Sequence, residues 1–273
     1  NKPHIGTDLL RDVVKQIRER IIALGGEVRF FAKLTDIFHE NGHVTAVEVN
    51  GTEKIETNDV ILALGHSARD TFTMLFQKQI ALEQKPFAMG VRIEHPQSMV
   101  NAAQYGAFAE KLPAADYRLA YTTQKNRGVY TFCMCPGGYV VAASSEKGRL
   151  AVNGMSEHAR DGKNANAAVL VQVFPENFGS SHPLAGMYFQ QDLEEKAFLA
   201  GGGDYTAPIQ TVGQFLGNTE DGIKEVMPSY CPNTTFANME EIFPAFMIEA
   251  LKEGLQAFGK KLKGFDRPDA ILT

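Results

Sequence analysis

The stretch DVILALGHSARDT, residues 59–71, decides the fold that we expect for the first part of the chain. Residues 60–64 form an apolar run that is typical of a strand buried on both faces. The run ends at Gly65, where the chain turns, and a helix is predicted over residues 68–79. A buried strand that turns through glycine into a helix is typical of an α/β domain, and such a turn brings backbone close to a ligand.

The composition is that of a globular protein with one large domain or two ordinary ones. The chain has 273 residues, of which 44% are hydrophobic, enough to fill a core. Its net charge of −5 argues against a nucleic-acid partner, because such proteins carry a basic stripe. No apolar run approaches the ~20 residues that span a bilayer, and no signal-peptide pattern opens the chain. Three cysteines, an odd number, fit a reducing compartment. We therefore expect a cytoplasmic protein with no membrane partner.

Residues 1–84 are expected to form a first lobe of one helix and several strands. The helix begins at Thr7 or Asp8 and ends at Gly25. Apolar alternation and turn residues predict strands over 27–31, 33–38 and 44–49, before the strand of the opening stretch. This lobe is α/β-like.

Residues 85–266 are expected to form a second lobe with a mixed, mainly antiparallel sheet and helices, which makes the whole an α+β fold. Strands are predicted over 87–96 and 168–174, a three-stranded antiparallel meander over 128–154, and helices over 98–106, 184–200, 209–216 and 239–262. Pro244 should either kink the last helix or mark its first turn. Residues 267–273 look like the start of a strand that returns to the first lobe, as in a piece of a longer protein.

Cys133 and Cys135 are candidates for a catalytic role. They lie two residues apart on a predicted strand, so both side chains should point to one face. A C-x-C pair could exchange electrons or contact a substrate, but the usual redox spacing is C-x-x-C at a helix N-terminus. Inert buried thiols are the other interpretation. No metal site is expected, because a structural zinc ion needs four ligands and no second Cys/His pair has a suitable spacing.

Arg92 and His95 are two further catalytic candidates, in the strand GVRIEHPQ. Arg92 and Glu94 share one face of the strand, where they could form a surface ion pair. Alternatively, Arg92 could hold an acidic group of a substrate, or His95 could move a proton. A group of polar residues offers the same choice between turn hydrogen bonds and a pocket: Asn153, Ser156, Arg160, Asn164 and Asn166.

Glycine patterns do not supply a complete dinucleotide site. The motif G-x-G-x-x-G lets backbone approach a pyrophosphate at a helix N-terminus, and no register of this sequence contains it. The runs at Gly137 and Gly201 are better explained as turns.

Several blocks of sequence are nevertheless distinctive: KPHIGTDLLRDVVKQIR, GGEVRF, VILALGHSARDTF, KPFAMGVRIEHPQ, CMCPGG, NGMSEHARDGKNANAA and PSYCPN. Together they resemble a bacterial family of FAD-dependent dehydrogenases, also described as uncharacterised FAD-dependent proteins. The resemblance covers almost the whole chain, and GHSARDTF and FCMCPGG are specific in combination. In that family a glycine-rich Rossmann loop lies upstream and further FAD-contacting segments lie downstream, so this chain resembles the middle of the family.

The resemblance implies three contacts with FAD. The adenine would meet the backbone of Lys33, Leu34 and Thr35, the pyrophosphate would meet Leu64, Gly65 and His66, and the flavin would meet His4, Gly6 and Thr7. Without the resemblance, these segments are a hairpin strand, a helix-entry turn and an N-cap.

For the intact protein, the resemblance implies an FAD-dependent oxidoreductase, of dehydrogenase or reductase type. The second lobe would then cap the flavin and bind a small-molecule substrate, and electrons would come from NADH, NADPH or the substrate itself. This chain alone should hold little FAD, because it lacks the glycine loop. The alternative is a non-catalytic domain that binds a ligand or partner on a flavoprotein-like scaffold.

Overall fold

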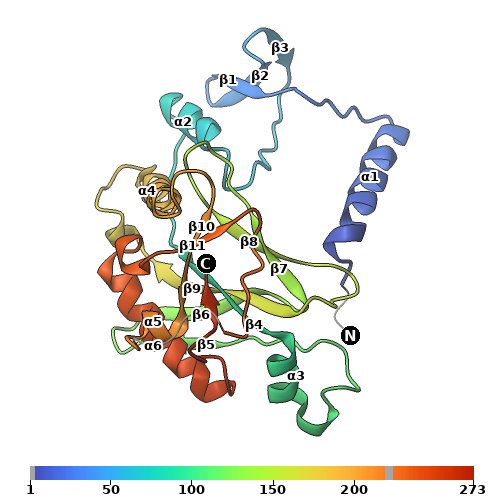
Figure 1. Cartoon of the computed structure of the whole chain (residues 1–273). Helices are drawn as coiled ribbons and strands as arrows, with labels where there is room; N and C mark the ends of the chain where they lie inside the picture. Colours follow the sequence, from blue (N-terminus) through green and yellow to red (C-terminus); the bar gives the residue numbers. More distant parts are fainter. Residues whose placement is uncertain (1–3, 219–223) are drawn as a thin grey trace. The chain divides into compact units, whose positions relative to one another are not determined.

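The computed structural model describes residues 4–218 and 224–273 (Figure 1). It divides into two compact units, which we describe separately. The sheet unit contains the described parts of residues 1–11, 86–174 and 190–273, and the hairpin unit contains residues 12–85 and 175–189. Helices and strands both contribute substantially, which confirms the α+β fold.

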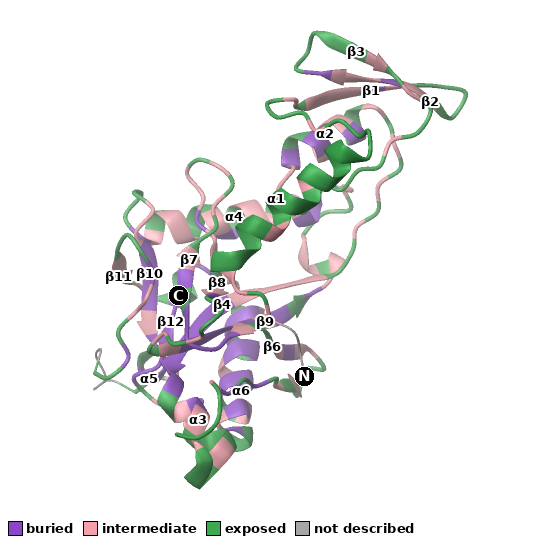
Figure 2. Cartoon of the chain, turned by 90° about the vertical axis from the view of Figure 1, so that its right-hand side faces the viewer, coloured by how far each residue is buried: buried purple, intermediate pink, exposed green. Residues whose placement is uncertain are grey.

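The sheet unit is built on a seven-stranded sheet with the order β11-β10-β12-β4-β9-β6-β5. In chain order its strands are β4 (Phe87–Pro96), β5 (Ala120–Thr122), β6 (Gly128–Cys135), β9 (Asn164–Val173), β10 (Ala207–Thr211), β11 (Thr234–Phe236) and β12 (Ile271–Leu272). Neighbouring strands are antiparallel, except that β10 and β11 run parallel. Most residues of the long central pair of β4 and β9 are buried, and Figure 2 shows the buried residues concentrated here and in α6.

One face of this sheet is covered by α6 (Ala245–Lys261), which contacts β5, β6 and β9. The helix buries one face, made by Met247, Ile248, Ala250, Leu251, Gly254, Leu255 and Phe258. It approaches β6 closely, since a Cβ atom on Gly254 would lie only 2.6 Å from Cγ1 of Val129. Val129, Val169 and Val171 therefore point toward α6 and form the core.

The opposite face carries a separate two-stranded sheet of β7 (Gly138–Ala142) and β8 (Val152–Ser156), which contacts β4, β6 and β9. We call this pair the covering hairpin. Besides α6, the chain after β4 forms the helices α3 (Gln97–Tyr105), α4 (Ala185–Ala200) and α5 (Val212–Phe215), with short 3-10 turns at Gly106–Phe108, Pro175–Asn177 and Met239–Glu241. No described helix is both long and apolar enough to cross a membrane.

The hairpin unit is a three-stranded antiparallel sheet followed by a helix. Its strands are β1 (Leu34–Glu40), β2 (His43–Val49) and β3 (Glu53–Glu56), in the order β1-β2-β3, and its helix is α2 (Arg69–Gln77). Tight turns at residues 41–42 and 50–51 join the strands, as their Asn-Gly sequences predict. The long helix α1 (Thr7–Ala23) has no buried residue, and Figure 2 shows it exposed along most of its length.

Two predicted strands are wrong for this structure. Residues 27–31 and 60–64 form no strand, and Ile61 is 93% exposed. A strand needs hydrogen-bonding neighbours and cover on its faces. The described residues provide neither for these two segments, although their composition suits a buried strand.

Two other predictions need correction. The expected meander over 128–154 is divided, because β6 pairs with β5 and β9 while β7 and β8 pair only with each other. Residues 207–211 are a strand rather than part of a helix, since their apolar residues fill the sheet.

Pro244 is the N-cap of α6, so it marks the beginning of the helix and does not kink it. The strand predicted near the C-terminus is β12, but it does not return to the first lobe: it pairs with β4 and β10 inside the sheet unit.

Candidate functional site

The structure brings three of the four catalytic candidates together, and Arg92 lies at their centre. Arg92 is on β4, and its side chain points to the face covered by the hairpin. It is only 4% exposed. The interpretation of Arg92 and Glu94 as a surface ion pair is therefore wrong, because both are buried and each binds other groups.

The guanidinium of Arg92 donates hydrogen bonds to groups from three strands. Its Nε donates to Oδ1 of Asn166 at 2.8 Å, and Nη1 lies 3.4 Å from Oδ1 of Asn153. Its Nη2 donates to the carbonyl of Cys133 at 2.8 Å and lies 3.6 Å from Sγ of Cys135. All of these acceptors are uncharged in the thiol state, so the buried positive charge is hydrogen-bonded but not neutralised.

A β-bulge sets the two cysteines apart from each other. On β6, Phe132 is opposite Ala168 and Cys135 is opposite Asn166, so β6 has one more residue than β9 between these pairs. Cys133 adopts a φ of 46°, rare for a residue other than glycine. As a result Cys133 is exposed while Cys135 is buried. The sequence predicted two equivalent thiols on one face, and the structure instead gives them different surroundings.

The two thiols also differ in acidity. A hydrogen bond from the Cys135 thiol, helped by the charge of Arg92, lowers the pKa of Cys133 to about 6. The same hydrogen bond, together with burial, raises the pKa of Cys135 well above the ordinary value for a thiol. Cys133 is thus the thiolate of the pair near neutral pH, and Cys135 keeps its proton.

Two glycines allow this packing, Gly154, which no sequence motif indicated, and Gly137, which was predicted only as a turn. A Cβ atom on Gly154, in β8, would lie 2.2 Å from Nη2 of Arg92, so only glycine lets the covering hairpin lie against the guanidinium. A Cβ atom on Gly137 would lie 1.9 Å from the carbonyl oxygen of Arg160. A glycine inside a predicted strand indicates close approach of another group, so the signal at Gly154 was available in the sequence.

Glu94 forms a second buried polar group on the same face. Its carboxylate accepts hydrogen bonds from Oγ of Ser229 at 2.6 Å and from Nδ2 of Asn164 at 2.8 Å. The backbone N–H of Ser229 also donates to it, at 3.0 Å. The same Ser229 Oγ accepts from the N–H of Val140 in β7, so this group ties the covering hairpin to β4. Nothing in the sequence pattern singled out Ser229.

His95 is not part of the Arg92 cluster. Side chains alternate along a strand, so the odd-numbered His95 points to the face covered by α6. It is fully buried, with Nε2 2.7 Å from the carbonyl of Phe265, and it packs against the rings of Phe265 and Tyr117. Burial lowers the pKa of His95 to about 4. A neutral, enclosed imidazole fits a packing role better than proton transfer.

In the hairpin unit, the backbone of Leu34 is the best placed of the predicted adenine contacts. Lys33 uses its carbonyl for the N–H of Asn50 and its N–H for the side chain of Asn50. Because backbone groups alternate along a strand, the N–H and C=O of Leu34 point the other way, to the edge of β1 that has no strand neighbour among the described residues. The Thr35 hydroxyl is occupied by Glu48 and Gly51.

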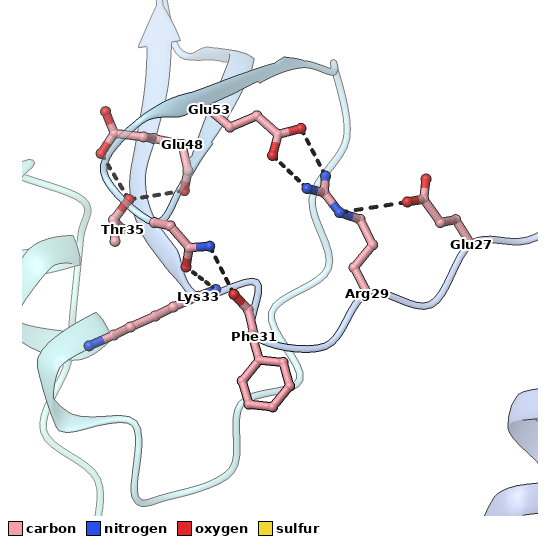
Figure 3. A network of polar contacts seen from close by, with 8 residues as sticks. Glu27, Arg29, Phe31, Lys33, Thr35, Glu48 and Glu53 are labelled. Carbon is pink, nitrogen blue, oxygen red and sulfur yellow. Dashed lines mark hydrogen bonds and ion pairs between the residues drawn. The ribbon is translucent and has the colours of Figure 1, made fainter.

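Figure 3 shows polar contacts around this segment. Arg29 forms a bidentate pair with Glu53, with distances of 2.9 and 2.5 Å, and Thr35 Oγ1 donates to Glu48 at 2.8 Å. The Lys33 side chain extends away from both. Its ammonium lies 2.5 Å from Oδ2 of Asp70, and this contact lowers the pKa of Asp70.

The predicted pyrophosphate contacts, Leu64, Gly65 and His66, lead directly into α2. Gly65 has a φ of 69°, and the space around its missing Cβ is open to at least 4 Å. The ion pair of Lys33 with Asp70, at the start of α2, holds this turn near β1. The structure therefore brings the predicted adenine and pyrophosphate segments into one neighbourhood.

The N-terminal loop with His4, Gly6 and Thr7 belongs to the sheet unit. Nε2 of His4 lies 3.1 Å from the carbonyl of Glu157, and Oγ1 of Thr7 donates to the sulfur of Met155. A Cβ atom on Gly6 would lie 2.3 Å from the N of His158. The loop is thus fixed against the end of β8, and its role as a flavin contact stays a prediction.

Among residues 4–218 and 224–273, no cluster of three or more His, Cys, Asp or Glu side chains could hold a metal ion.

Comparison with known proteins identifies the class to which this fold and these segments belong. Residues 86–273 match the family described as "FAD-dependent protein, C-terminal domain-like". The chain therefore belongs to this family of FAD-dependent proteins, as the sequence resemblance predicted.

A relative is known in a clostridium. An uncharacterised protein of Clostridium beijerinckii is 52% identical over 277 residues, an alignment that covers all of this chain and 52% of the relative. The chain thus spans about half the length of the curated relative it matches.

Proposed function

We propose that the whole protein is an FAD-dependent oxidoreductase and that this chain supplies part of its FAD site and its substrate-binding domain. The observation that carries the proposal is membership of the FAD-dependent family over residues 86–273. When bound, FAD supplies the redox chemistry, and the protein supplies binding, orientation and electrostatics. The substrate is a small molecule, and NADH, NADPH or the substrate itself provides the electrons.

The residues of the hairpin unit fit the role of holding FAD. The outward N–H and C=O of Leu34 form a donor–acceptor pair on an open strand edge, which is what the edge of an adenine ring requires. At Gly65 a positive φ and open surroundings leave the backbone accessible to a pyrophosphate. These two positions are therefore our assignments for the adenine and pyrophosphate contacts.

Replacing Gly65 by alanine in the whole protein tests this assignment. The left-handed conformation costs alanine about 1–2 kcal/mol. Without FAD, the turn at residue 65 should therefore move to another conformation. FAD binding would have to return it to the left-handed one at that cost. Since 1.4 kcal/mol is a factor of ten, we expect about ten-fold weaker FAD binding, measured by fluorescence titration.

Anaerobic NADH or NADPH should bleach the bound FAD of the unmodified protein if either is the electron donor.

Gly42→Ala is the matched control. Gly42 also has a positive φ, of 80°, and open space around the missing Cβ, but it lies at the far end of β1 from Leu34. Its substitution should carry the same backbone cost and leave FAD affinity unchanged within about two-fold. Equal losses of affinity in both variants would show that Gly65 makes no special contact.

A further inference from the structure

The buried charge of Arg92 requires compensation. Within residues 4–218 and 224–273, no carboxylate lies within ion-pair distance of its guanidinium, whose hydrogen-bond partners are two amides, a carbonyl and a sulfur. A buried cation with only neutral partners is costly. An anion beside it is correspondingly stabilised. The thiol of Cys135 lies 3.6 Å from Nη2, and the charge of Arg92 also acts on the thiol of Cys133, whose backbone carbonyl accepts from the same Nη2.

The two cysteines are arranged unequally around this charge. Cys133 is exposed on the bulge, where a small molecule can reach it, and Cys135 is 7% exposed beneath it. Sγ of Cys135 donates to the carbonyl of Cys133 at 3.3 Å, so its sulfur lies against the peptide of its neighbour. One accessible thiol backed by one buried thiol is the arrangement that thiol–disulfide exchange uses.

We propose that Cys133 and Cys135 form a redox-active dithiol that reduces low-molecular-weight disulfides, with Cys133 as the attacking thiolate and Cys135 as the resolving thiol. Arg92 is a positioning residue, which stabilises the negative charge and orients the sulfurs through its hydrogen bonds. This role does not depend on the flavin proposal, because the dithiol itself holds the two electrons.

The exchange proceeds in two steps. The Cys133 thiolate attacks one sulfur of the disulfide RSSR, forms a mixed disulfide and releases RS⁻. Cys135 then loses its proton to a released thiolate, and its sulfur attacks the sulfur of Cys133 and expels the second RS⁻. The products are a Cys133–Cys135 disulfide, one RSH and one RS⁻, so two electrons pass from the protein to the disulfide.

The acidities of the two thiols support these roles. The pKa of Cys133 is lowered to about 6, so this thiol is ionised near neutral pH. The pKa of Cys135 is raised, so this thiol stays protonated until the first disulfide has formed. An ordinary cysteine has a pKa of about 8.5 and reacts more slowly at neutral pH.

Oxidised glutathione is a suitable probe, and the whole protein is the material to use. The protein is reduced with dithiothreitol, desalted, exposed to oxidised glutathione, quenched with acid, alkylated with iodoacetamide and digested with trypsin. Cleavage after Arg127 and Lys147 places both cysteines on the peptide of residues 128–147, while Cys231 lies on another peptide. Mass spectrometry should find this peptide unalkylated and lighter by two hydrogen atoms.

Three variants separate the roles. Cys135→Ser should stop at a glutathione adduct on Cys133, and Cys133→Ser should react at least about ten-fold more slowly, because only the buried thiol remains. Cys231→Ser is the control. Cys231 is also a free, exposed cysteine, but it lies outside the Cys133–Cys135 pair, so its substitution should leave the reaction of peptide 128–147 unchanged. Recovery of peptide 128–147 with both thiols alkylated, or with glutathione held on both, would overturn the proposal. The readout requires no FAD, so it fails independently of the proposed function.

Discussion

Gly137→Ala is expected to lower the free energy of unfolding of the sheet unit by about 2–5 kcal/mol. The φ of Gly137 is 50°, a conformation that costs alanine about 1–2 kcal/mol. In addition, a Cβ atom there would lie 1.9 Å from the carbonyl oxygen of Arg160 and 2.3 Å from its carbon. Backbone cannot rotate away as a side chain can, so overpacking adds about 1–3 kcal/mol. The loop of residues 160–162, whose Gly162 N–H donates to the carbonyl of Gly137 at 3.1 Å, would have to move.

Gly148→Ala separates the two contributions to this loss. Gly148 also has a positive φ, of 74°, but nothing lies within 4 Å of its missing Cβ. Its substitution should cost only the conformational part, about 1–2 kcal/mol. Urea unfolding of the chain and both variants measures the difference. Similar losses for the two variants would mean that the loop at Arg160 does not press against Gly137.

Acidification is expected to destabilise the sheet unit through His95. The pKa of His95 is about 4 in the folded protein and about 6.5 when unfolded, because burial disfavours the imidazolium. Between these values the unfolded state binds more protons, so the free energy of unfolding falls as the pH falls. The stabilisation is fully present above about pH 6.5, and about 3 kcal/mol of it is lost on approach to pH 4.

His95→Gln should remove this part of the pH dependence. The glutamine amide can still donate to the carbonyl of Phe265, but it does not titrate in this range. His43→Gln, at an exposed position in β2, is the control and should retain the full dependence. Urea unfolding at about pH 7, 5.5 and 4 provides the comparison. If the free energy of unfolding of the His95→Gln variant fell as steeply with acidification as that of the unmodified chain, a group other than His95 would cause the pH dependence.

The sequence predicted the site best where local rules apply. Strand alternation places Arg92 and Glu94 on one face, which the structure confirms, and the motif CMCPGG correctly directed attention to residues 133–138. The bulge that exposes Cys133 and buries Cys135 could not be predicted, because it depends on the register between β6 and β9. Ser229 was missed for the same reason, since only the fold brings it to Glu94.

The stretch of residues 59–71 shows that composition alone does not determine whether a strand forms. Residues 60–64 have the composition of a strand buried on both faces, yet they are not a strand here. Strand formation requires hydrogen-bonding partners that lie elsewhere in a chain, and composition says nothing about whether they are present. The turn at Gly65 and the helix after it depend on local backbone preferences, and both are found.

The flavin content of the whole protein shows whether it binds FAD. The purified protein would be incubated with FAD and desalted, and its visible absorption spectrum recorded beside that of residues 1–273 treated in the same way. We expect the whole protein to retain about one FAD per chain, because a complete site supplies both pyrophosphate and adenine contacts. A whole protein that elutes without flavin would contradict the account and favour the non-catalytic binding domain.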